Sequence, residues 1–219
     1  MDAFIKKQEY NYIKKCMIDL NNSFTGCIDK NVIAASKIYI QDKILNHFQN
    51  LSDSQKKILD ISNFTTSLHI EAFLNDLDEY VYGMPVVTNA QINRLFKKEK
   101  KLKLPKADAQ DLKHVYLGWI DNSVRKLFVA YNMNGKLLGM SCRITNPDNK
   151  SSHRCIFCNR MGKSDQIAFV SPLCKVSNPE LGAYKSLGFD MCLDSEQCNS
   201  HIVSVDKLED ILKTVNNIK

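Results

Sequence analysis

The chain has 219 residues, 44% of them hydrophobic and 25% charged, which is ordinary for one large soluble domain or two small ones. No stretch approaches the ~18 apolar residues of a membrane span. The N-terminus lacks the apolar core of a secretory signal, so we expect a cytoplasmic protein without a membrane partner. Its eight cysteines are then expected to be thiols or metal ligands rather than disulfides.

The first 84 residues show the three- and four-residue spacing of apolar side chains that is typical of amphipathic helices. Asp29 is a predicted N-cap, and Ser52 with Gln55 forms the pattern of a capping box. The helices are expected over residues 2–24, 29–50, 52–61 and 66–82. Short connections between them predict an antiparallel bundle, and no catalytic motif lies in it.

Residues 85–106 are predicted to form a junction, in which a helix over 88–98 runs into a lysine-rich stretch. Residues 94–106 hold seven basic residues against one acidic residue, so most of the net charge of +6 lies here. The stretch is either a solvated linker or an electrostatic contact for RNA or an acidic protein. The candidate contacts are Lys97, Lys98, Lys100 and Lys101.

Residues 107–219 change to the pattern of strands separated by turn residues. Three strands near residues 115–120, 125–131 and 137–144 predict an antiparallel meander, with Trp119 as a core anchor. A further strand at 167–171 and a helix over 205–218 follow. The predicted fold class is therefore α+β, with the helical bundle followed by an α/β domain.

Four cysteines in this second domain have metal-ligand spacing. Cys155 and Cys158 are separated by two residues, and Cys192 and Cys198 by five. Thiolates suit the tetrahedral coordination of zinc, and the order of knuckle, hairpin and helix is that of a treble-clef zinc finger. We therefore predict one structural Zn²⁺. Four protein ligands leave no position for water or substrate, which argues against a zinc hydrolase.

Other interpretations of these cysteines remain open from the sequence alone. They could be unrelated reduced thiols, or Cys155 and Cys158 could form a redox pair. Cys174, His153 or His201 could also replace a ligand. The chain lacks HExxH, GxGxxG and Walker patterns, so no enzymatic activity is expected.

Several motifs together carry a resemblance that covers nearly the whole chain. They are Tyr10-Asn-Tyr-Ile13, the segment Leu95–Pro105, Gly118-Trp119, the Cys155-x2-Cys158 pair and the segment Met191–Asn199. With them the chain resembles the elongation factor G-binding proteins of the FusB-type fusidic acid resistance family. The resemblance implies a helical N-terminal domain and a C-terminal domain built on a four-cysteine zinc finger.

The resemblance also implies a function. Family members bind elongation factor G through the C-terminal domain and promote its release from the ribosome in the presence of fusidic acid. Carried over to this sequence, the partner-binding residues are Phe169, Lys185, Phe189 and Leu208. Phe169 could instead be a core strand residue. We expect a monomer without a small-molecule substrate, and the alternative function is an RNA- or ribosome-binding zinc protein that uses the basic junction.

Overall fold

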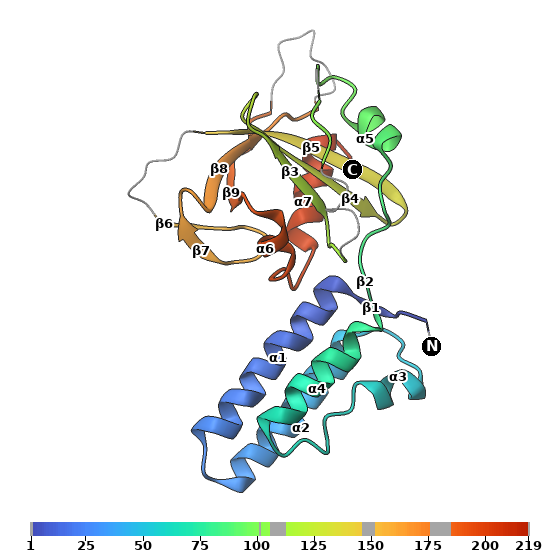
Figure 1. Ribbon diagram of the computed structural model, residues 1–219, viewed down its shortest axis with the longest axis vertical. Helices are drawn as coiled ribbons and strands as arrows, with labels where there is room; N and C mark the ends of the chain where they lie inside the picture. Colours follow the sequence, from blue (N-terminus) through green and yellow to red (C-terminus); the bar gives the residue numbers. More distant parts are fainter. Residues whose placement is uncertain (1, 101, 106–112, 146–151, 176–184, 219) are drawn as a thin grey trace. The chain divides into compact units, whose positions relative to one another are not determined.

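The computed structural model divides the chain into two compact units, Met1–Tyr82 and Gly83–Lys219 (Figure 1). It describes residues 2–100, 102–105, 113–145, 152–175 and 185–218. Each unit has a hydrophobic core of its own. Within the described part of the chain, no helix has both the length and the apolar composition that a membrane span requires.

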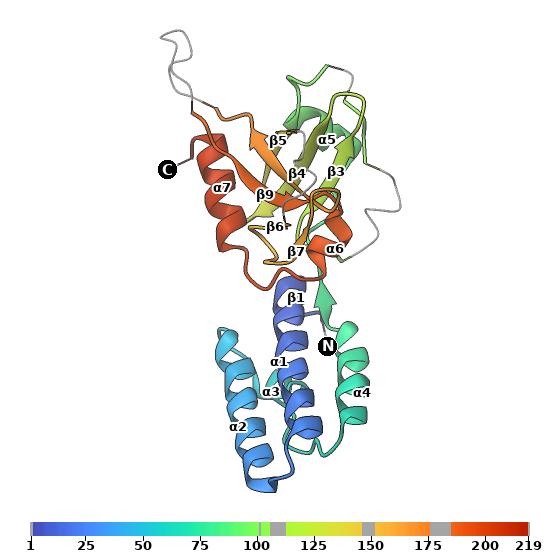
Figure 2. The same cartoon turned by 90° about the vertical axis from the view of Figure 1, so that its left-hand side faces the viewer.

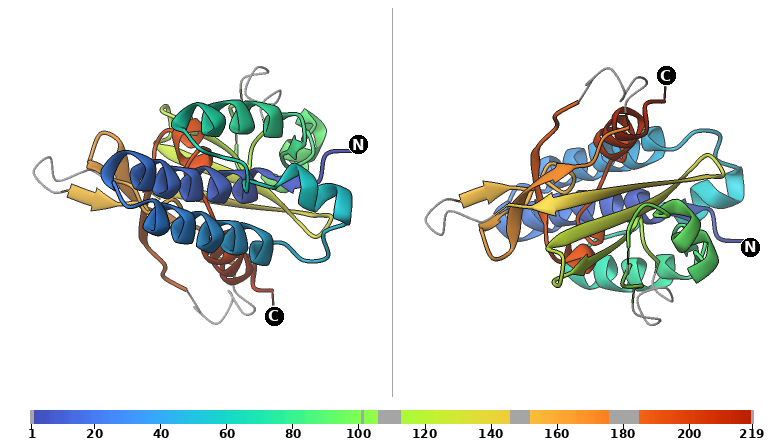
Figure 3. Two further views of the ribbon diagram at one scale, coloured as in Figure 1. Left: turned by 90° about the horizontal axis from the view of Figure 1, so that it is seen from below. Right: turned by 90° about the horizontal axis from the view of Figure 1, so that it is seen from above.

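The first unit is the predicted bundle. Its helices are α1 (Lys7–Gly26), α2 (Lys30–His47), α3 (Asp53–Ile58) and α4 (Ser67–Asp78). Helices α1, α2 and α4 lie side by side, as the left view of Figure 3 shows. The core between them is hydrophobic and includes Ile13, Leu20, Ile44 and Leu77, each at most 1% exposed. This burial, rather than helix propensity alone, holds helices of such length in place.

The capping signals in the sequence are present where they were predicted. The Asp29 carboxylate accepts a hydrogen bond from the Asn31 backbone N–H at 2.8 Å. Ser52 and Gln55 form the reciprocal capping box that begins α3. These side chains satisfy backbone N–H groups that have no partner within the helix.

The two ends of the first unit differ from the sequence prediction. Residues Ile5–Lys6 form β1 and residues Val81–Tyr82 form β2, and the two short strands pair in parallel. The Tyr80 carbonyl accepts hydrogen bonds from the Phe4 and Ile5 N–H groups, both at 3.0 Å. The first helix therefore begins at Lys7 rather than near residue 2, and α4 ends at Asp78.

The second unit is built on an antiparallel five-stranded sheet, seen from above in the right view of Figure 3. The first three strands form the predicted meander, and the last two are added as a hairpin. In spatial order the strands are β3 (Leu117–Asp121), β4 (Lys126–Met133), β5 (Lys136–Ile144), β8 (Ile167–Pro172) and β9 (Phe189–Cys192).

Both faces of this sheet are covered. On β4, Leu127 and Val129 belong to one core, whereas Phe128 and Ala130 belong to another, as the two-residue period of a strand requires. Helix α7 (Asp206–Asn216) packs on the first face and α5 (Asn89–Leu95) on the opposite face (Figure 2). The middle of β4, residues 127–131, is therefore buried on both faces.

Helix α5 belongs to the second unit. Ile92 and Phe96 are buried against Phe128, and the Phe96 ring meets Trp119 edge-on with ring centroids 5.5 Å apart. The sequence prediction treated residues 85–106 as a separate junction with a helix to residue 98. In the structure the helix ends at Leu95, and its apolar side chains close one face of the sheet.

Candidate metal centre and the surface around it

The first cysteine pair lies on a tight turn between β6 (Ser152–Arg154) and β7 (Met161–Lys163). The Cys155 N–H donates to the Arg160 carbonyl, and the Asn159 N–H donates to the Cys155 carbonyl, both at 2.9 Å. Asn159 adopts a left-handed conformation with φ of 61°, which Asn tolerates better than most residues. The turn therefore places both thiols on one side of the hairpin.

The second pair comes from the end of β9 and from the short helix α6 (Ser195–Asn199). Asp194 caps α6 by accepting hydrogen bonds from the Glu196 and Gln197 N–H groups. The cap fixes the turn that separates Cys192, on the strand, from Cys198, on the helix. Knuckle, β8–β9 hairpin and helix follow one another in the order expected from the sequence.

The four thiols converge. Their sulfur atoms all lie within 4.8 Å of one another, and all four residues are buried. The Cys155 and Cys198 sulfurs are 3.8 Å apart, and those of Cys158 and Cys192 are 3.5 Å apart. Four ligands at about 2.3 Å from a tetrahedral zinc would be about 3.8 Å from one another. These distances are far from the ~2.05 Å of a disulfide, so the donor set fits a metal ion.

The thiols strongly perturb one another. Hydrogen bonds from the three other thiols, that of Cys158 first, lower the pKa of Cys155. The pKa of Cys198 is raised chiefly because its thiol donates a hydrogen bond to Cys155, and burial adds to this effect. Removing every proton would gather four negative charges, which only a cation can offset. A bound metal ion supplies this charge, since a coordinating thiol is deprotonated outright.

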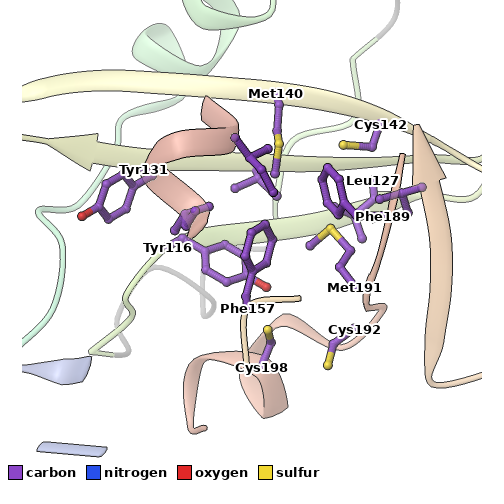
Figure 4. Packing of buried hydrophobic residues seen from close by; sticks show 14 of the residues in the cluster. Tyr116, Leu127, Tyr131, Met140, Cys142, Phe157, Phe189, Met191, Cys192 and Cys198 are labelled. Atoms are coloured by element: carbon purple, nitrogen blue, oxygen red, sulfur yellow. The ribbon is translucent and has the colours of Figure 1, made fainter. Parts of the chain in front are cut away.

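Two residues that the sequence did not single out support the cluster. The Tyr116 hydroxyl is completely buried without a conventional hydrogen-bond partner among the described residues, and it faces the Cys198 sulfur (Figure 4). The Asn199 side chain accepts hydrogen bonds from the Val115 and Tyr116 N–H groups and donates to the Tyr116 carbonyl. Asn199 thus ties the cysteine-bearing helix to the start of the sheet. No spacing rule points to either residue.

The alternative ligands lie outside the cluster. Cys174 is not among the converging thiols, and it is half-buried beside Cys142. His153 Nδ1 is 3.2 Å from an Asp190 carboxylate oxygen, and His201 Nδ1 pairs locally within α6 and the residues after it. Cys155 is 0% exposed, which does not suit a redox thiol that must reach its substrate.

The four residues expected to bind a partner fall into two groups. Phe169 is 45% exposed on β8 and Lys185 is also exposed, so both can contact another molecule. Phe189 is only 7% exposed and Leu208 only 1%. Both belong to the apolar core that α7 and β9 form with the sheet, and their expected role as direct contacts is therefore corrected to a role in packing.

The basic residues of the junction are accessible. Lys97, Lys98 and Lys100 are exposed, and Lys101 lies outside the described residues. Between the second and third of these lysines, Glu99 turns inward and binds Lys126 at 2.6 Å and Ser141 at 2.8 Å. The described part of the stretch is therefore held to the sheet by Glu99 and by the Lys103 carbonyl, which accepts a hydrogen bond from the Trp119 indole N–H at 2.8 Å.

Comparison with known proteins places these observations in a family context. Residues 4–85, which span the first unit, match the family model described as "Elongation factor G-binding protein, N-terminal". The solved structure titled "Structure of the fusidic acid resistance protein FusC" is similar over 98% of both chains, with 24% identity and a TM-score of 0.78. A search of curated proteins finds no match. The family match confirms the predicted resemblance for the first unit, and the structural match extends the shared fold to both units.

Proposed function

We propose that this protein binds elongation factor G and promotes its release from the ribosome, and that it thereby protects translation from fusidic acid. The observation that carries the proposal is the match of residues 4–85 to the N-terminal family of elongation factor G-binding proteins. A fold shared over nearly the full length with the fusidic acid resistance protein FusC supports it.

The proposed mechanism is binding without a chemical step. A protein that binds the released factor more tightly than the ribosome-bound factor shifts the population toward release. In this proposal the cysteine cluster holds one Zn²⁺ with a structural role, since four thiolates fill its coordination sphere. The metal would hold the β6–β7 turn, the end of β9 and α6 in one arrangement.

The proposed contact surface lies beside this scaffold, around Phe169. The ring lies against Gly188, where an added Cβ would come within 2.3 Å of it. Gly188 therefore leaves room for the tip of the ring beside the start of β9, three residues after the exposed Lys185. A large, rigid and half-exposed aromatic ring is the kind of anchor on which interface energy concentrates.

Calorimetric titration of purified elongation factor G tests both the partner and the surface. The wild-type chain is expected to form a 1:1 complex. Phe169→Ala should weaken it by about 2 kcal/mol, or about thirtyfold in Kd, since anchors of this kind cost that much when truncated. The matched control is Val124→Ala, which removes another exposed apolar side chain of the same unit.

The outcomes test the proposed partner and the proposed contact surface separately. Failure of the wild-type chain to bind at micromolar concentration would refute the partner. If both substitutions weaken binding equally, or if neither weakens it, the proposed role of the Phe169 surface is refuted.

Release is tested by sedimenting ribosomes on which fusidic acid has trapped elongation factor G. The wild-type chain should move the factor to the supernatant, and Phe169→Ala should do so about thirtyfold less effectively at subsaturating concentration.

A further inference from the structure

A second surface of this unit, which lies beside α5, has the features of a docking groove. It has a volume of about 830 Å³ and runs between α5, the middle of β5, the segment after β8 and the C-terminal end of α7. Helix α5 crosses β5 at Gly139, where an added Cβ would meet the Leu95 side chain at 2.7 Å. This close crossing leaves a channel beside it rather than a filled core.

The wall of the groove is apolar. Leu95 and Leu137 are partly buried in it, and Leu173 is 44% exposed at its far side. Exposed leucine is ordinary when single, but here three apolar side chains line one concave surface. The groove is therefore able to bury apolar side chains of another molecule.

The rim of the groove is basic on both sides. Arg94 comes from the last turn of α5, and Lys97 and Lys98 from the segment directly after it. Lys175 lies opposite, where its ammonium donates to the Asn216 side chain at 2.8 Å. The acidic residue in the lining, Glu99, is already bound by Lys126 and Ser141. Among the residues that the structure describes, no ion pair neutralises Arg94, Lys97 or Lys98.

This combination selects a class of partner. An apolar channel with three cations along one side and Lys175 on the other is complementary to a peptide segment with apolar residues on one face and carboxylates beside them. A nucleic acid is a less favoured partner, because proteins that bind single-stranded nucleic acids use exposed aromatic rings on which the bases stack. The aromatic residue in this lining, Phe96, is 7% exposed and packs against Trp119 and Phe128.

We propose that this groove docks an acidic amphipathic segment of a partner protein. The binding would combine apolar burial against Leu95, Leu137 and Leu173 with electrostatic attraction from the rim. The site is separate from the Phe169 surface and does not depend on the binding of elongation factor G.

Fluorescence anisotropy with the full chain tests the proposal. The probe is a labelled 15-residue peptide with leucines along one helical face and glutamates elsewhere. A scrambled peptide of the same composition and a single-stranded 15-nucleotide RNA serve as comparisons. The amphipathic peptide is expected to bind at least tenfold more tightly than the scrambled one, with an affinity that falls as salt rises.

Two variants within the groove and two control variants outside it locate the site. Leu173→Asp and the double change Lys97→Glu with Lys98→Glu should each weaken the peptide at least tenfold. Val124→Asp and Lys163→Glu change exposed residues of the same types outside the groove and should leave it unchanged. All five positions are exposed, so thermal melting should show folded variants.

Three results would overturn the proposal. One is the absence of peptide binding at 100 μM. Another is equal binding of the scrambled peptide, which would indicate attraction by charge alone. The third is RNA binding that depends on Lys97 and Lys98 together with no preference for the amphipathic peptide, which would assign the rim to nucleic acid.

Discussion

Tyr116 connects the hydrophobic core of the second unit to the cysteine cluster. Its ring packs edge-on against Phe157 with ring centroids 6.2 Å apart, and its hydroxyl faces the Cys198 sulfur (Figure 4). Burial and the neighbouring Cys198 raise the pKa of the phenol well above its ordinary value, so the hydroxyl keeps its proton. A protonated hydroxyl beside a thiolate is a hydrogen-bond donor to it. Donors of this kind stabilise the charge on a metal ligand.

The substitution Tyr116→Phe should therefore loosen the metal. Loss of an outer-shell partner typically costs tenfold to a hundredfold in metal affinity, and we expect about tenfold in zinc affinity here. Competition with a chromophoric chelator measures it. Tyr131→Phe is the matched control, because that buried hydroxyl donates to Glu209 at 2.8 Å, away from the cysteines. Equal zinc affinity in Tyr116→Phe and wild type would contradict the assigned role.

At the scale of elements, local signals in the sequence predicted what the structure contains. Capping residues such as Asp29 and Ser52 act within one helical turn, so their pattern is visible in sequence order. The cysteine spacing is also a local signal, because the two members of each pair are only two or five residues apart. These signals located the helices of the first unit and the four converging thiols.

Features that depend on distant contacts could not be predicted in this way. The β1–β2 pair joins two-residue strands from opposite ends of the first unit, which is too short for any periodicity. The burial of Phe189 and Leu208 depends on which faces of β9 and α7 turn toward the sheet. The inward turn of Glu99 within a run of lysines depends on Lys126 and Ser141, from two other strands.

The Glu99 contact links the segment after α5 to β4 and β5, and its energetic contribution can be measured. Burial alone would raise the pKa of Glu99, but hydrogen bonds from Lys126 and Ser141 outweigh it and lower the pKa. The carboxylate therefore contributes stability above its ordinary pKa near 4.5, and this is lost as pH falls through the lowered value.

We expect Glu99→Gln to lower the free energy of unfolding of the second unit by about 1–3 kcal/mol at pH 7, because Lys126 loses its charged partner. Urea unfolding followed by Trp119 fluorescence reports it. In a cycle with Lys126→Met, the double variant should be more stable than the sum of the single losses predicts. Additive losses would indicate that the two side chains do not interact.

At the scale of the whole molecule, the metal and the first unit are expected to be independent. The four cysteines and their supporting residues all lie after residue 83, whereas the first unit has its own hydrophobic core. Most of the described helical residues belong to the first unit. The single tryptophan, Trp119, belongs to the second. Helical circular dichroism and tryptophan fluorescence therefore report mainly on different units.

Removal of the metal should unfold the second unit and leave the first intact. Structural zinc contributes about 10–16 kcal/mol in small zinc-binding peptides, which is comparable to the whole stability of a typical domain. A strong chelator should therefore shift Trp119 fluorescence to longer wavelength while most of the helical signal at 222 nm remains. Cys192→Ser should reproduce this state, and Cys27→Ser, which changes a thiol of the first unit, should not. A simultaneous loss of both signals would show that the two units unfold together, and unchanged fluorescence would show that the sheet does not need the metal.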